Sequence, residues 1–159
     1  MQRCDSMTSR RRFLQGSAAA LATFLLPLAA QAQSGTIKLG GIAPLTGGNS
    51  FDGPPTAKVM KGLVDEINAA GGVNGRKIEI FIEDDQSSPE AAVRAVRNLI
   101  DVRKVIAICC SGSSAVTMAI APLCWESKVM LTTVSGADAI TQLPHQGYIL
   151  RTQPNTTFQ

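Results

Sequence analysis

The chain has 159 residues, with 15 lysines and arginines against 12 aspartates and glutamates, a formal net charge of +3. Four of those arginines and one of the acids lie within residues 1–32, so the rest carries 11 basic and 11 acidic side chains. Because the part that would fold is formally neutral, its net charge gives no support for a nucleic-acid partner, and we expect none.

The first segment of the chain, SRRRFLQGSAAALATFLLPLAAQAQ at 9–33, is typical of an export signal. Three arginines precede an apolar stretch at 16–30, and Ala30-Gln31-Ala32 forms a small-x-small cleavage site. The order Ser-Arg-Arg-x-Phe-Leu predicts a twin-arginine-type signal peptide over 1–32, with the ordinary secretory route as the alternative. We expect cleavage near Ala32 and a periplasmic product, because no later segment is apolar for long enough to span a bilayer.

The next segments predict a strand, a loop and a helix. TIKLGGIAP at 36–44 is a short apolar run that ends in proline, and the following loop at 46–55 is rich in glycine, asparagine and aspartate. Pro55 suits the first helical position, and apolar residues then recur at helical spacing. Gly71-Gly72 should end this helix.

The second strand–helix pair follows at 77–83 and 86–100. The strand alternates apolar and charged residues, which favours a place near an edge of the sheet. For the helix, we expect Ser88 as N-cap, Pro89 at the first helical position and Glu90 in the first turn.

The last regular elements are a strand at 105–110, a helix at 113–127 and a strand at 129–134. The first of these strands is apolar throughout, as a central parallel strand should be. Pro122 should kink the helix or end it early. A short helical patch and an extended finish complete the chain. The alternation of strands and helices with short connections predicts an α/β fold with a doubly wound parallel sheet.

Ligands of such sheets bind beyond the carboxyl ends of the strands, which directs attention to three loops. These are the loop at 44–54, the turn Ser111-Gly112-Ser113-Ser114 and the turn Ser135-Gly136-Ala137-Asp138. The serines of the first turn stand where a helix begins, so they either help to bind an anion or simply cap the helix, and the local sequence does not separate the two readings. The second turn is either a ligand contact or an ordinary turn in which Asp138 caps a short helix.

Other groups that could carry chemistry have simpler interpretations. Glu83-Asp84-Asp85 suggests a metal site, but a solvated strand end is the favoured reading, and we expect no metal and no cofactor. Three cysteines follow the signal, and an odd number leaves at least one thiol unpaired. Cys109, Cys110 and Cys124 are interpreted as small buried residues. The nucleophile-elbow, phosphate-loop and dinucleotide-binding patterns are absent. A serine hydrolase would need His145, the single histidine, as its base.

At this point the residues resemble a known family. The stretch IKLGGIAPLTGGNSFDG, the run EINAAGGVNGRKIEI, the acidic end of the second strand and the pair VSGADAIT and YILRTQP are similar to type I periplasmic solute-binding proteins. The resemblance is closest to the leucine/isoleucine/valine-binding branch of ABC-transporter receptors. It implies a fold of two α/β lobes, of which residues 33–159 would be the first, and a small solute that is held in the cleft between them.

The resemblance also implies which residues contact the solute. Ser113 or Ser114, together with Ser135, Gly136 and Ala137, would hold the α-carboxylate and α-ammonium groups of an amino acid. Phe51 or Asp52 falls where the family often places an aromatic residue near the ligand. The implied partners are an amino-acid-like solute and the membrane permease of the transporter, and the complete receptor would be a monomer.

Relatives in this family are far longer, so we expect the first lobe to be incomplete and to bind weakly or not at all by itself. The function that the sequence predicts is therefore solute binding without catalysis, for branched-chain amino acids or a similar small solute. The alternatives are a ligand-sensing receptor domain of the same fold and, less favoured, a fragment of a serine hydrolase.

Overall fold

The computed structural model describes residues 35–110, 112–154 and 156–158, all within one compact unit, Ser34–Gln159. The predicted signal peptide at 1–32 and Ser111 of the serine-rich turn lie outside these residues. In the described part of the chain, no helix is long and apolar enough to cross a membrane.

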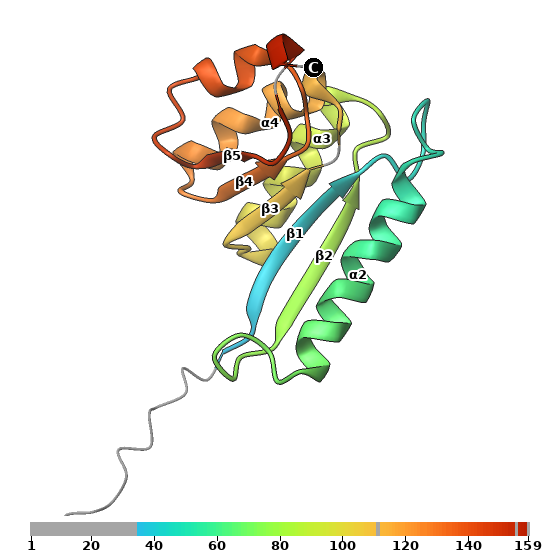
Figure 1. The fold of residues 1–159 in the computed structure, drawn as a ribbon, viewed down its shortest axis with the longest axis vertical. Helices are drawn as coiled ribbons and strands as arrows, with labels where there is room; N and C mark the ends of the chain where they lie inside the picture. The colour runs from blue at the N-terminus through green and yellow to red at the C-terminus, as the bar shows by residue number, and fades with distance from the viewer. Residues whose placement is uncertain (1–34, 111, 155, 159) are drawn as a thin grey trace, which may run out of the picture. The chain divides into compact units, whose positions relative to one another are not determined.

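The described residues form a parallel sheet of five strands in the order β2-β1-β3-β4-β5, as predicted for an α/β fold (Figure 1). β2 lies at an edge and β3 at the centre, which confirms both sequence predictions. The short β5 was expected only as an extended segment. The bounds of the strands are β1 Ile37–Ala43, β2 Ile78–Asp84, β3 Ala107–Cys110, β4 Met130–Thr133 and β5 Ile149–Arg151.

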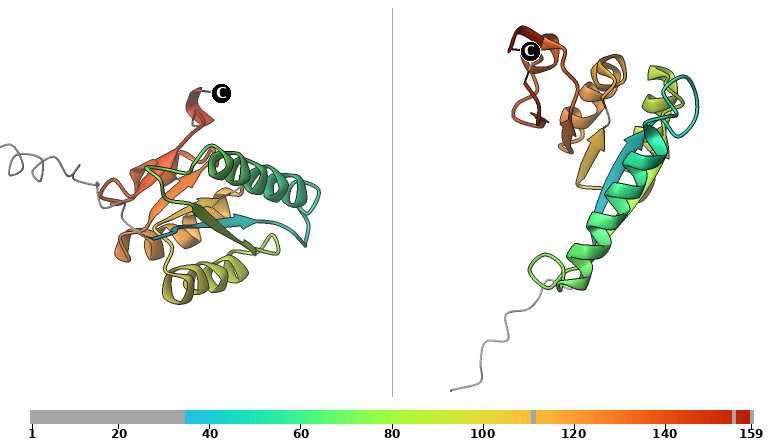
Figure 2. Two further views of the ribbon diagram at one scale, coloured as in Figure 1. Left: turned by 90° about the horizontal axis from the view of Figure 1, so that it is seen from below. Right: turned by 45° about the vertical axis from the view of Figure 1, so that its right-hand side comes forward.

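Helices cover both faces of this sheet, so it is doubly wound (Figure 2). Helix α2, Gly53–Ala69, packs on β1 and β2 from one side. Helices α3, Pro89–Arg97, and α4, Ser114–Glu126, contact each other on the opposite side. Because α2 connects β1 to β2 while α3 crosses back from β2 to β3, the direction of winding reverses at the boundary between β1 and β3.

The starts of the helices largely follow their sequence signals. Ser88 caps α3, and its side chain accepts a hydrogen bond from the Ala91 N–H. Helix α2 begins at Gly53 rather than at Pro55, so both prolines lie in its first turn, where a backbone N–H would have no partner within the helix.

The ends of the helices differ more from the sequence predictions. Gly71 and Gly72 follow α2 with positive φ angles of 107° and 79°, as expected of a helix stop. Pro122 does not end α4, which continues to Glu126 because its last turns are buried around Cys124. The predicted helix at 86–100 instead continues from α3 into a π-helical segment, η1, Asn98–Arg103. Lys104 then ends it in the left-handed conformation, with a φ of 57°.

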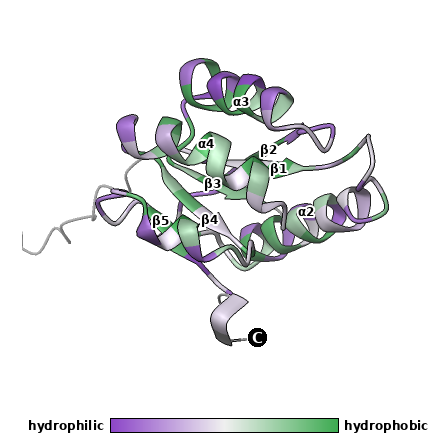
Figure 3. Cartoon of the chain, turned by 90° about the horizontal axis from the view of Figure 1, so that it is seen from above, coloured by the Kyte–Doolittle hydropathy of each residue, from purple (hydrophilic) through white to green (hydrophobic). Residues whose placement is uncertain are grey.

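The hydrophobic core lies between the sheet and the α3–α4 layer. Figure 3 shows α3 with a hydrophilic outer side and a hydrophobic side toward the strands. Leu99 of η1 is fully buried against Gly40 of β1 and Ile108 of β3, and a glycine at position 40 leaves room for the leucine side chain. Fully buried apolar side chains from several elements complete this layer, among them Ile42, Val96, Ile120, Leu131 and Ile140.

The other face of β3, β4 and β5 is apolar but less covered. Alternate residues of β4 and β5 are buried toward α4, whereas Met130 and Leu150 are 44% and 53% exposed. On α2, Val59 and Leu63 are also exposed. The sheet is therefore well covered by helices on the α3–α4 side and only partly covered on the α2 side.

The prediction that the three cysteines after the signal are small buried residues holds for two of them. Cys110 and Cys124 are buried, and Cys109 is half-buried on the other side of β3. Burial raises the pKa of Cys110 and of Cys124 from an ordinary value of 9.0 to about 12. In the range between these values the unfolded chain loses protons that the native chain keeps, so alkali favours unfolding.

We expect the free energy of unfolding to fall above pH 9 by about 1.4 kcal/mol per pH unit for each buried thiol. Urea unfolding at a series of pH values measures this slope, and the variant Cys124→Ala should have a shallower slope than the parent. Cys109→Ala serves as the matched control, since Cys109 is half-buried. An unchanged slope in Cys124→Ala would show that this thiol does not contribute to the pH dependence.

Candidate functional site at the carboxyl ends of the strands

Three loops meet where the direction of winding reverses. They follow β1, β2 and β3, whose carboxyl ends lie at the same edge because the strands are parallel. In open α/β sheets this switch point is the place where ligands bind. The loops at 44–54 and 112–114, which the sequence analysis selected, therefore do come together here.

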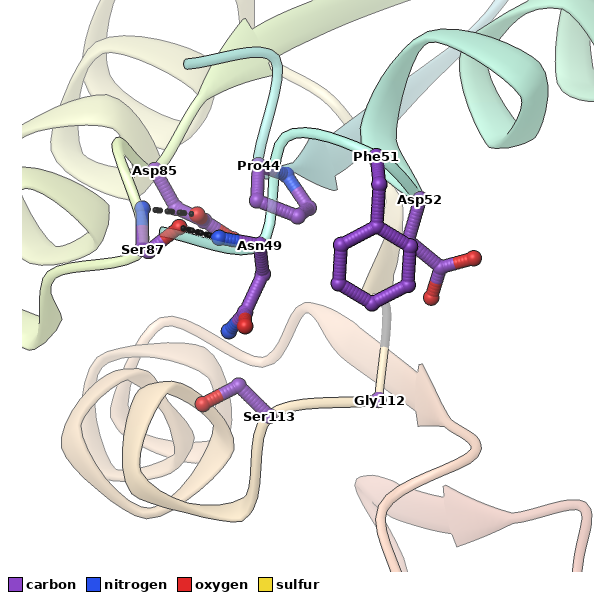
Figure 4. Close-up of a pocket in the computed structure, with 8 residues that line it drawn as sticks. All are labelled: Pro44, Asn49, Phe51, Asp52, Asp85, Ser87, Gly112 and Ser113. Atoms are coloured by element: carbon purple, nitrogen blue, oxygen red, sulfur yellow. Dashed lines mark hydrogen bonds between the residues drawn. The ribbon is translucent and has the colours of Figure 1, made fainter. Parts of the chain in front are cut away.

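A pocket of about 260 Å³ opens between these loops (Figure 4). Of the predicted ligand contacts, Phe51, Asp52 and Ser113 line it. Phe51 is 78% exposed, and Figure 4 shows its ring and the Asp52 carboxylate across the pocket from the Asn49 side chain. The complete lining is Pro44, Asn49, Phe51, Asp52, Asp85, Ser87, Gly112 and Ser113.

The loop after β1 is fixed to the end of β2 by hydrogen bonds. The Asp84 carboxylate accepts from the Thr46 N–H at 3.1 Å and from the Thr46 hydroxyl at 2.6 Å. The Ser87 hydroxyl accepts from the Asn49 N–H at 2.9 Å. Burial by itself would raise the pKa of Asp84, but the hydrogen bonds from Thr46 and from the Gln86 N–H outweigh it and hold that pKa below its usual value. The wall that carries Phe51 and Asp52 is thus held in place.

Asp85 corrects the interpretation of the acidic run as a solvated strand end. Its side chain is 1% exposed, and its Oδ1 accepts from the Ser87 N–H at 2.8 Å in the turn that leads into α3. Burial raises the pKa of this carboxyl group. Sequence reasoning missed Asn49, Asp85 and Ser87 as lining residues, and the only available signal was their position after β1 and β2. The described residues hold no cluster of side chains that could bind a metal ion.

The two serines that begin α4 have different local roles. The Ser113 hydroxyl caps the helix by accepting from the Val116 N–H at 3.4 Å, while the same residue lines the pocket. Capping and a position at the pocket are therefore combined in one residue. The Ser114 hydroxyl instead accepts from the Ala137 N–H at 3.3 Å, which joins the start of α4 to the loop after β4.

Burial of Ser135 and hydrogen bonds from Arg151 fix the loop at 135–137. The Ser135 side chain is fully buried, and Arg151 donates to the carbonyl oxygens of Gly136 and Ala137 at 3.3 Å and 2.9 Å. None of these three loop residues lines the pocket of Figure 4. Contact of Ser135, Gly136 and Ala137 with a ligand stays a prediction, and of the three only Gly136 and Ala137, which are half-buried, are accessible in this structure.

Asp138 does not cap the short helix that follows it, the 3₁₀ segment η2, Asp138–Gln142. Its carboxylate accepts hydrogen bonds from the hydroxyls of Thr156 and Thr157, which belong to the last described segment, η3, Thr156–Phe158. These bonds, chiefly the one from Thr157, hold the pKa of Asp138 below its usual value.

His145 lies away from the candidate site. It precedes β5, at the end of the sheet where the parallel strands begin, whereas Ser113 and Ser114 follow β3, at the end where the strands finish. Its Nδ1 accepts a hydrogen bond from the Gly147 N–H at 3.1 Å. The arrangement that a serine hydrolase needs, with a histidine beside the nucleophile, is not formed by these residues.

The fold and the pocket at its switch point are those of an α/β solute-binding lobe. A family model described as periplasmic binding protein matches residues 36–159, and the chain belongs to that family. An "Amino acid binding protein" of Pseudomonas aeruginosa is 32% identical over 109 residues, which are 67% of this chain and 29% of the relative.

Solved structures give the same result. The branched-chain amino acid transporter substrate binding protein LivJ of Streptococcus pneumoniae, in complex with isoleucine, has a TM-score of 0.71 at 30% identity, over 76% of this chain and 34% of that one. A solute binding protein of an ABC transporter from Rhodopseudomonas palustris, in complex with 3,4-dihydroxybenzoic acid, has a TM-score of 0.62 at 32% identity, over 76% and 32%. The chain thus spans about a third of the length of the proteins it matches.

Proposed function

We propose that residues 33–159 are the first ligand-binding lobe of an exported receptor that delivers a small solute to an ABC transporter. The observation that carries this proposal is the pocket at the β1–β3 switch point, which Phe51, Asp52 and Ser113 line together. Residues 1–32 act as the twin-arginine-type signal, with cleavage near Ala32. The receptor binds its solute in the periplasm as a monomer, makes and breaks no bond, and presents the solute to a membrane permease.

The ligand that the pocket suits best carries a carboxylate. The N–H groups in the first turn of α4 have no partners within the helix, and the helix dipole favours negative charge there. Ser113 adds a hydroxyl at the same place. Asp52 on the opposite wall pairs with an ammonium group, and the accessible parts of Gly136 and Ala137, which are half-buried, extend the grip on a zwitterion. A branched-chain amino acid meets these requirements.

A second candidate, an aromatic carboxylic acid, is favoured by Phe51. Its ring is 78% exposed at the pocket, where it can stack on another ring. The two solved relatives were bound to isoleucine and to 3,4-dihydroxybenzoic acid, which share a carboxylate and differ in the rest of the molecule. The carboxylate is accordingly the common element of the proposal, and the remainder of the solute decides between the candidates.

Amide NMR spectra of the ¹⁵N-labelled 159-residue chain test this proposal and detect weak binding. We expect isoleucine or 3,4-dihydroxybenzoate at millimolar concentrations to shift the amide signals of Phe51, Asp52, Ser113 and Ser114 in a saturable way. Isoleucinamide, which lacks the carboxylate, should bind at least about tenfold more weakly than isoleucine.

The turn at Val73–Arg76, at the opposite edge of the sheet from the pocket, supplies the internal control. Its amide signals should not move with either ligand. If either acid binds and its saturable shifts concentrate at 73–76 or elsewhere, and not at Ser113 and Ser114, the proposed site is wrong.

A further inference from the structure

Three hydroxyl groups form a closed cluster beneath the predicted ligand loops. Thr117 lies one turn inside α4, Thr133 ends β4, and Ser135 follows two residues later. The Thr117 hydroxyl is 2.7 Å from the Ser135 hydroxyl and 3.1 Å from the Thr133 hydroxyl, and Thr133 donates to Ser135 at 2.9 Å. All three side chains are at most 2% exposed. We call Thr117, Thr133 and Ser135 the hydroxyl triangle.

The hydrogen-bonding capacity of the hydroxyl triangle is largely used within the protein. Each hydroxyl has one hydrogen to donate. If every hydroxyl donates to the next one in the same direction around the triangle, all three hydrogens are used. Thr133 also accepts from the Ser135 N–H at 3.1 Å, and the Cys110 thiol lies 3.6 Å from the Thr117 hydroxyl. With its hydroxyl buried and bonded in this way, Ser135 cannot reach a ligand with its side chain.

Stability alone does not generally require buried hydroxyl groups. Apolar side chains of the same shape often replace a buried hydrogen-bonded pair at little cost in stability. A fully bonded polar cluster differs from an apolar core because it accepts only one geometry of its members. The hydroxyl triangle therefore fixes how the start of α4 stands relative to the end of β4.

That relative position matters at the candidate site. The residues just before Thr117 include Ser113 and Ser114, and the residues just after Ser135 are Gly136 and Ala137. The bond from the Ala137 N–H to the Ser114 hydroxyl, at 3.3 Å, is the direct link between these two loops. It is longer than an ordinary N–H···O bond, and its two ends belong to α4 and to the loop after β4, the two segments that the hydroxyl triangle joins.

We propose that Thr117, through the hydroxyl triangle, is a positioning residue that sets the spacing between the ligand loops at 113–114 and 135–137. The expected effect on ligand affinity rests on the proposed function. The structural part of the inference, the coupling of Thr117 to the Ala137 N–H, holds with or without a ligand.

The test compares Thr117→Val, which removes the hydroxyl and keeps the branched shape, with Thr117→Ser, which keeps the hydroxyl. We expect hydrogen exchange at the Ala137 amide to be about tenfold faster in Thr117→Val than in the parent and to return nearly to the parent rate in Thr117→Ser. Isoleucine affinity, measured by the NMR titration, should fall about tenfold in Thr117→Val and be recovered in Thr117→Ser.

A purely structural role of Thr117 predicts a different result. Thr117→Val would then shift the melting temperature, while exchange at Ala137 and the affinity of the folded protein stayed at the parent values, and that outcome overturns the inference. If Thr117→Val fails to fold, Ser135→Ala removes another corner of the triangle without placing a new methyl group among the hydroxyls and is judged by the same two readouts. Binding of the acids away from Ser113 and Ser114 would contradict the proposed function. With that result, or with no measurable binding by the incomplete lobe, the exchange rates still decide whether Thr117 positions the loop.

Discussion

Replacing Gly53 by alanine is expected to lower the free energy of unfolding by about 3 kcal/mol. Gly53 is the first residue of α2, and a Cβ atom there would lie 2.0 Å from the Pro44 carbonyl oxygen and 2.3 Å from its carbon. Both atoms belong to the backbone at the end of β1, which cannot turn aside as a side chain can. The start of α2 and the loop that lines the pocket would have to separate.

Gly62→Ala is the matched control in the same helix. Position 62 is exposed in the middle of α2, and a Cβ atom there meets nothing within 4 Å. Because glycine disfavours helix, this variant should gain about 0.5–1 kcal/mol. Urea unfolding followed by circular dichroism measures both variants. Equal stabilities of Gly53→Ala and Gly62→Ala would show that α2 does not need its close approach to Pro44.

The close contact at Gly53 illustrates what the sequence pattern does and does not reveal. Periodicity and glycine placement predicted the helix at α2, the edge position of β2 and the central position of β3, because these follow from which residues must be buried. The start of α2 at Gly53 depends instead on a tertiary contact with Pro44. Likewise, β5 has only three residues, too few for a pattern, and is a strand because β4 offers it an edge.

The candidate site was predictable to a similar depth. Its location followed from the rule for parallel sheets, and Ser113, Phe51 and Asp52 were named from loop position and family resemblance. The role of individual side chains was not predictable, because the sequence does not show whether a serine caps a helix, is buried or is accessible to a ligand. Ser135 bonds inward and Asp85 is buried in a turn, and both facts depend on neighbours distant in the chain.

The second large effect is expected in the core, where Leu99→Ala should lower the free energy of unfolding by about 3 kcal/mol. Leu99 is fully buried, and its Cδ1 atom would lie 2.9 Å from a Cβ atom at Gly40. Val102→Ala is the control on the same π-helical segment, since Val102 is 68% exposed and should change stability by no more than about 0.5 kcal/mol.

The same contact predicts that Gly40 and Leu99 are coupled. Gly40→Ala alone should destabilise by about 1 kcal/mol, because the new methyl group overlaps the leucine side chain. In the Leu99→Ala background the methyl group keeps its 3.1 Å contact with Ile108 but no longer overlaps the leucine, and it fills part of the cavity. The double variant should therefore be more stable than the sum of the single effects predicts, by about 1 kcal/mol. Urea unfolding of the four proteins measures this coupling, and strictly additive effects would mean that the glycine in β1 is not there to admit Leu99.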